Sequence, residues 1–241
     1  MASIPPSNQS GARPLPRGTV DVRQLLGLLL LMIPIILLWN TFVIYPLKIL
    51  VVFFHELSHG VMAMLTGGRV VSIEVVRQEG GLCLTQGGSR FLTLSAGYLG
   101  SLLWGGAVLV LAARTRLDRA IAAALGTIIV LATLGWVRPL WSFGFWFHLA
   151  AGAVILGIGL CLPEKLNEGV LKVFGLTSCL YVIPDIYSDT IARSGLVSDA
   201  RMLAEITHIP TVVWGSAWIL LAVVLSLACL RVACLSRSDG T

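Results

Sequence analysis

The chain has 241 residues, of which 56% are hydrophobic and only 12% are charged, and its mean hydropathy is +0.89. A soluble domain of this size carries about a quarter charged residues, so the composition excludes an ordinary soluble protein and indicates one embedded in a membrane. The net charge of +5 predicts membrane lipid and no nucleic acid as a partner, because the basic residues lie mostly at the ends of apolar stretches.

The apolar stretches predict an all-α polytopic membrane protein with about six to seven helices, since most approach the roughly 20 residues that a bilayer helix needs. Residues 1–22, rich in Pro, Ser and Gly, are expected to form a disordered tail. Residues 23–234 then form one membrane-embedded domain, and 235–241 a C-terminal tail. The expected spans are 25–44, 46–65, 91–113, 120–137, 143–162, 170–192 and 211–234.

Residues 69–88, after the second span, change character. Side chains alternate along 70–77, Gly80-Gly81 is a turn signal, and 82–85 is a candidate return strand. This pattern predicts a small membrane-associated β-hairpin.

The third span carries small residues at helical spacing, which let helix backbones approach closely. They are Ser95, Gly97, Gly100, Ser101, Gly105 and Gly106.

The second span contains His55-Glu56-Leu57-Ser58-His59, and its three ionisable side chains are costly to bury at membrane depth. His55 and His59 lie one helical turn apart, so both imidazoles point the same way and can bind one zinc ion. Glu56, rotated about 100° around the helix, is placed to take a proton from a zinc-activated water. We therefore predict zinc as the cofactor, His55 and His59 as metal ligands and Glu56 as the catalytic residue.

A catalytic zinc needs a third protein ligand, and the sixth span offers Asp185 and Asp189. The two lie four residues apart and share a helix face. We favour Asp185, because Pro184 before it loosens the helix, whereas Asp189 can pair with Arg193 or hold a ligand histidine. Asp199 is typical of an N-cap for a short helix at 200–207 and ranks below both.

The remaining histidines and the cysteines have simpler interpretations. His148 is expected to be a core or supporting histidine and His208 a loop residue near the interface. The chain has five cysteines and no Cys-x-x-Cys pair, and the four in or next to apolar stretches are expected to be small buried hydrophobic residues: Cys161, Cys179, Cys229 and Cys234. Aromatic residues between 136 and 147 are typical of an interfacial belt.

The order of these motifs resembles the site-2 protease family of intramembrane zinc metalloproteases, in particular its peptidase-M50B-like branch. The resemblance covers about residues 50–215. It is carried by the motif at 54–59, Ser95-Ala96-Gly97-Tyr98-Leu99-Gly100-Ser101, Asp185-Ile186-Tyr187-Ser188-Asp189 and Ser198-Asp199-Ala200. It implies His55 and His59 as zinc ligands, Glu56 as acid/base, and Asp185 or Asp189 as third ligand. It also implies that the hairpin edge receives an unwound substrate as an added strand.

The function expected is hydrolysis of peptide bonds in a membrane protein or peptide substrate, by a multi-pass integral membrane enzyme. Two alternatives stay open: a zinc-dependent lipid amide hydrolase, and a catalytically silent zinc-binding membrane protein. Retention of Glu56 weighs against silence, because zinc binding does not require it.

Overall fold

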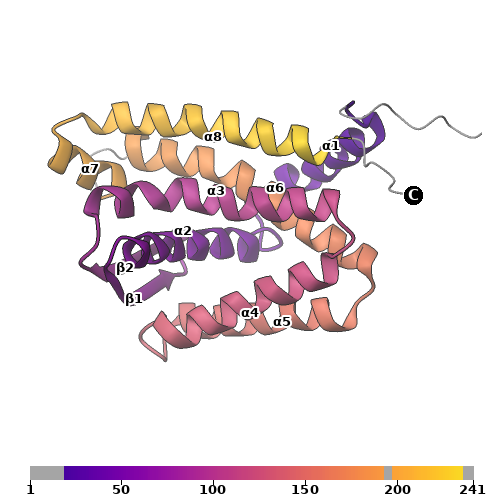
Figure 1. Cartoon of the computed structure of the whole chain (residues 1–241), viewed down its shortest axis with the longest axis horizontal. Helices are drawn as coiled ribbons and strands as arrows, with labels where there is room; N and C mark the ends of the chain where they lie inside the picture. The colour runs from indigo at the N-terminus through magenta and orange to yellow at the C-terminus, as the bar shows by residue number, and fades with distance from the viewer. Residues whose placement is uncertain (1–18, 193–196, 236–241) are drawn as a thin grey trace, which may run out of the picture.

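The computed structural model describes residues 19–192 and 197–235, which form eight α-helices, one π-helical turn and one β-hairpin (Figure 1). The predicted tail at 1–22 therefore falls mostly outside the described residues, as does the tail from 236 on. In chain order the elements are α1 (Val22–Leu37), α2 (Tyr45–Leu65), β1 (Arg69–Val76), β2 (Gly80–Gln86), α3 (Arg90–Arg114), α4 (Asp118–Trp136), α5 (Phe143–Cys161), α6 (Glu164–Tyr187), the π-turn η1 (Ser188–Ala192), α7 (Asp199–Thr207) and α8 (Thr211–Ala233).

Six helices in the described part are long and apolar enough to cross a membrane: α2, α3, α4, α5, α6 continued by η1, and α8. This confirms an all-α multi-pass membrane protein. The first predicted span, 25–44, is wrong in length, because α1 has 16 residues and ends at Leu37. Thr41 explains the early end: its hydroxyl donates to Leu38 O at 2.6 Å and accepts from Val43 N at 3.3 Å. These local bonds compete with helix continuation.

The helix α2 lies at the centre of the molecule, and most of its side chains are buried. It packs against α3 and α6 on one side and the hairpin on the other (Figure 1). Its predicted limits are confirmed: Pro46 lies in the first turn, where its missing N–H has no helical partner to lose. Gly67, with φ +87°, adopts the left-handed conformation that ends helices.

Glycines of α3 bring neighbouring helices into close contact, as the small-residue spacing predicts. An added Cβ at Gly100 would overlap Ser58 of α2, and one at Gly105 would overlap Ser178 of α6. Side chains at these positions would push the helices apart.

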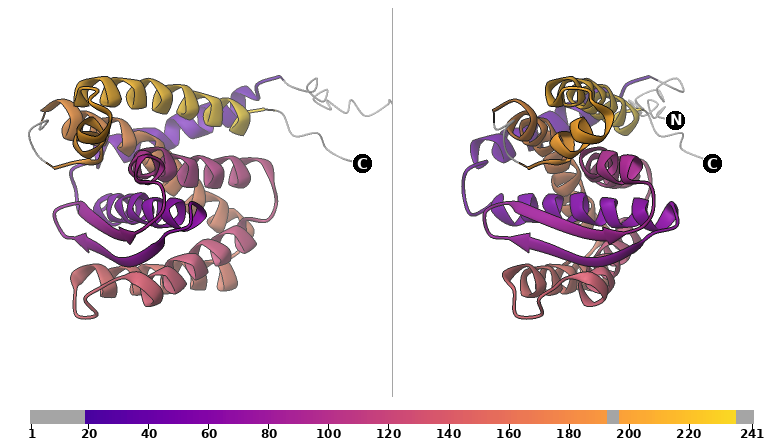
Figure 2. Two further views of the ribbon diagram at one scale, coloured as in Figure 1. Left: turned by 60° about the vertical axis from the view of Figure 1, so that its left-hand side comes forward. Right: turned by 90° about the vertical axis from the view of Figure 1, so that its left-hand side faces the viewer.

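The hairpin at 69–86 is confirmed and lies between α2 and the α4–α5 pair (Figure 2). β1 and β2 are antiparallel, with an irregularity between Val70 and Ser72. Beyond β1, Ile73 pairs with Val137, and Arg138 N donates to Ile73 O at 3.0 Å. β2 has no strand on its other side within the described residues, so β2 forms the open edge of the sheet.

The turn of the hairpin is attached to the start of α2. Tyr45 donates its hydroxyl hydrogen to Arg77 O at 2.9 Å, and Lys48 Nζ lies 2.7 Å from Glu79 Oε1. The hairpin is therefore held against the helix that carries both predicted histidine ligands.

Candidate metal centre

His55 and His59 of α2 have neighbouring rings, with centroids 4.8 Å apart. His59 Nδ1 lies 2.7 Å from Thr93 O, and because a carbonyl oxygen only accepts, Nδ1 carries the proton. His59 Nε2 is the ring nitrogen that faces Asp199, and in the neutral ring it is the nitrogen that can offer a lone pair to a cation. The pair has the geometry that one helical turn predicts.

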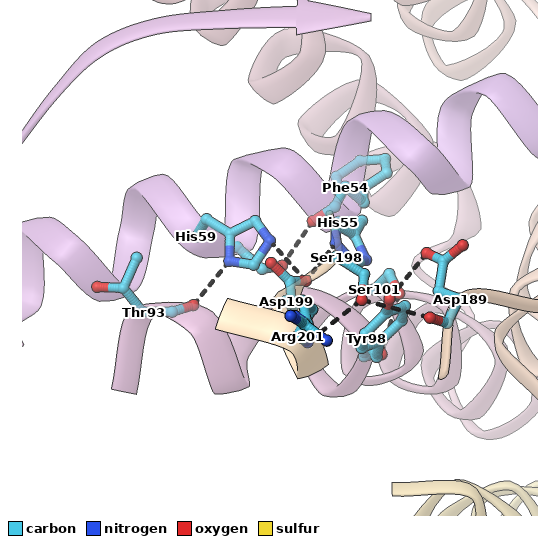
Figure 3. Close-up of polar contacts among 11 residues, drawn as sticks. Phe54, His55, His59, Thr93, Tyr98, Ser101, Asp189, Ser198, Asp199 and Arg201 are labelled. Atoms are coloured by element: carbon cyan, nitrogen blue, oxygen red, sulfur yellow. Dashed lines mark hydrogen bonds and ion pairs between the residues drawn. The ribbon is translucent and has the colours of Figure 1, made fainter. Parts of the chain in front are cut away.

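Asp199 brings its carboxylate to both histidines, with Oδ2 3.0 Å from His55 Nε2 and 3.1 Å from His59 Nε2 (Figure 3). The side chain is buried. Burial raises the pKa of Asp199, but the adjacent His59 and His55 imidazoles more than offset this and hold it below its ordinary value. The Asp199 carboxylate thus faces the Nε2 atoms of both histidines from inside the protein.

The expectation that Asp199 is an N-cap is wrong by one residue. The cap of α7 is Ser198, whose Oγ accepts from Arg201 N at 3.3 Å. Asp199 occupies the first helical position, so its carboxylate is free of the capping role and turns toward α2. The sequence thus located the start of the helix correctly, but the capping residue is Ser198 and not Asp199.

Asp185 and Asp189 lie near the centre but outside the group that His55, His59 and Asp199 form, whose ligand atoms are all within 4.8 Å of one another. Asp185, in the last turn of α6, is within electrostatic range of His55. Asp189, in η1, accepts a hydrogen bond from the Tyr98 hydroxyl at 2.9 Å. The predicted partner of Asp189, Arg193, lies outside the described residues.

Glu56 is buried and lies against β2. A Cβ added at Gly81 would come within 2.6 Å of Glu56 Cγ, so only glycine leaves room for the carboxylate there. Cys83 of β2 is also beside it: burial, together with the charges of Glu56 and Asp199, raises the pKa of Cys83 to about 12. Glu56 thus occupies the space between the histidine pair and the open-edged strand.

The donor set fits a zinc ion. Two imidazole nitrogens and one carboxylate oxygen are ligands that catalytic zinc uses, and ligands about 2.0–2.2 Å from a tetrahedral zinc lie roughly 3.4 Å from one another. The distances from Asp199 Oδ2 to the two Nε2 atoms, 3.0 and 3.1 Å, are close to this value. Gly97 of α3 lies directly against the two rings, because a Cβ there would be 2.6 Å from Cε1 of both His55 and His59.

The other histidines lie outside this group. His148 is fully buried, donates from Nδ1 to Gly144 O at 2.6 Å and stacks on Phe53 with a centroid distance of 4.5 Å, as expected of a core histidine. His208 ends α7 in a left-handed conformation. Among the cysteines, Cys179 and Cys234 are buried but Cys161 is exposed, so the expectation of buried hydrophobic residues holds only in part.

The fold and the His-His-Asp group define a helical multi-pass membrane protein with a potential metal site buried among its spans. The sequence profile of the Peptidase M50B-like family matches residues 28–229. The match covers most of the chain, and the protein belongs to this family. Searches of curated proteins and of solved structures gave no match.

Proposed function

We propose that the protein is an intramembrane zinc metalloprotease, with zinc bound by His55, His59 and Asp199. The observation that carries this proposal is the convergence of Asp199 on both histidines in a member of a peptidase family. It replaces our sequence-based choice of Asp185, which has no comparable contact with the histidine pair.

The metal ligands and Glu56 have separate roles in the proposed reaction. The two imidazoles and the carboxylate hold the ion, and when bound, zinc supplies Lewis acidity toward a water molecule and the substrate carbonyl. Glu56 accepts the proton of the attacking water and returns it to the amine that leaves. Glu56 is buried in an apolar helix, so bulk water does not compete for its carboxylate.

The substrate is proposed to bind along β2 as an added strand. Support comes from the open edge of β2 and from the contact between Glu56 and Gly81. An extended peptide that pairs with β2 would run past the proton acceptor, with its main-chain groups satisfied by the strand.

The test uses full-length protein in detergent, with zinc content and cleavage of a membrane-anchored peptide measured together. We expect one zinc per chain in the wild type and loss of the metal in His55→Ala. Glu56→Gln should keep its zinc and lose cleavage, because Glu56 moves protons and does not bind the ion. Wild-type-like turnover in Glu56→Gln would contradict the mechanism.

The same preparation separates the two alternative functions. A lipid amide offered in parallel should stay intact; hydrolysis of the lipid amide without peptide cleavage would identify a lipid hydrolase. Stoichiometric zinc with neither product, across several membrane-anchored peptides, would favour the silent zinc-binding protein.

A further inference from the structure

The two histidines of the centre are oriented by different means. His59 uses Nδ1 for a hydrogen bond to Thr93 O at 2.7 Å. His55 Nδ1 is buried and has no hydrogen-bond partner among the described residues. Histidine ligands almost always use the second ring nitrogen for a bond that fixes the ring, so the orientation of His55 requires another source.

Tyr98 of α3 supplies a contact of the right kind. Its ring meets that of His55 edge-on, with centroids 4.7 Å apart and planes at 77°. Trp218 of α8 packs on the same tyrosine at 5.2 Å, and Tyr98 is only 1% exposed. Its hydroxyl donates to Asp189 Oδ2 at 2.9 Å (Figure 3). The tyrosine ring therefore has little freedom to move away from His55.

Asp189 also contacts the element that carries the third proposed ligand. Its main-chain oxygen accepts from Ser198 Oγ at 3.3 Å, and Ser198 caps the helix that begins with Asp199. Asp189 lies in the π-turn η1, a widened turn of a kind often found at functional sites. The next residue, Thr190, packs tightly against Gly215 of α8, which holds the turn in place.

We propose that Tyr98 and Asp189 are positioning residues of the metal centre. Tyr98 holds the His55 ring by packing, in place of the missing hydrogen bond. Asp189 holds Tyr98 through its carboxylate and the cap of α7 through its carbonyl, and so couples the His55 side of the site to Asp199. This inference rests on the proposed function, because it takes His55 and Asp199 as ligands.

The experiment measures zinc affinity by competition with a chelating dye, and the visible spectrum of the cobalt-substituted protein, which reports ligand geometry. Tyr98→Leu and Asp189→Ala should each weaken zinc binding roughly 10–100-fold and change the cobalt spectrum. Tyr98→Phe keeps the ring and should fall between Tyr98→Leu and wild type. Asp189→Asn should restore most of the affinity, because its amide oxygen can accept the same hydrogen bond.

The matched control is Tyr181→Leu, which removes another buried tyrosine ring, one that packs on Trp39. It should lower thermal stability without changing the cobalt spectrum. The inference is overturned if Tyr98→Leu and Asp189→Ala bind zinc as the wild type does, if Tyr181→Leu changes the spectrum to the same extent, or if Asp189→Asn is as impaired as Asp189→Ala. A wild-type protein that binds no zinc would instead refute the proposed function.

Discussion

Replacing Gly97 by alanine tests the site without altering any proposed ligand. The added Cβ would lie 2.6 Å from Cε1 of His55 and 2.6 Å from Cε1 of His59. Carbon atoms in favourable contact are about 3.5–4.0 Å apart, so the rings must retreat by about 1 Å. Both imidazoles are rigid planes on a buried helix, so relief comes only by moving the rings or by separating α2 from α3.

The expected effect on zinc follows from this displacement. Ligand distances in a zinc site are met within about 0.2 Å, and the required movement is several times larger. We therefore expect Gly97→Ala to lower zinc affinity by at least the roughly 10–100-fold that loss of a supporting contact causes. Its stability without metal should change less: overpacking costs about 1–3 kcal/mol, and alanine regains about 0.5–1 kcal/mol over glycine in a helix.

Zinc affinity by competition and thermal unfolding in detergent are measured side by side. Gly100→Ala is the control, because its Cβ would overlap Ser58 at the same α2–α3 contact without touching a proposed ligand. We expect Gly100→Ala to lose stability and to keep zinc better than Gly97→Ala does. Wild-type zinc affinity in Gly97→Ala would refute the reasoning, since it would mean that these two imidazoles do not hold the ion where we place it.

Three further predictions concern the ligand set and the hairpin. Asp199→Ala should lose zinc while Asp185→Ala retains it, measured by metal analysis after dialysis; the reverse result would restore our sequence-based choice. If free zinc is 100-fold above the dissociation constant, chelation should lower the apparent unfolding free energy of the wild type by about 2.7 kcal/mol, measured by thermal unfolding. Glu56→Gln should show the same shift, because Glu56 is not a proposed ligand. Lys48→Met leaves Glu79 without its partner at 2.7 Å and should lower the free energy of unfolding by about 1–3 kcal/mol, measured by thermal unfolding. Glu205→Gln is the control, in a pair about half exposed, and should change the free energy of unfolding by about 0–1 kcal/mol. Equal losses in both variants would argue against a structural role for the hairpin contact.

Local patterns in the sequence were enough for most of the fold. Hydropathy located the six spans because each helix must satisfy its own backbone within the bilayer. Alternation followed by Gly80-Gly81 located the hairpin. The spacing of His55 and His59 placed both rings on one face, since helix geometry alone determines that relation. α1 was the exception, because its end depends on Thr41 side-chain bonds that a hydropathy pattern does not register.

The third member of the candidate metal centre was found only in the tertiary structure. Asp199 lies 144 residues from His55 in the chain, in a helix of nine residues that is too short for a span. Local spacing carries no information about such a contact. Asp185 was preferred because Pro184 precedes it, and Asp199 was ranked below it because its position is typical of an N-cap. The position of α7 depends on how α3, α8 and η1 pack together, and that packing turns the Asp199 carboxylate toward both histidines. The sequence by itself thus determined which helix carries the two candidate histidine ligands, and the packing of distant elements decided which carboxylate lies beside them.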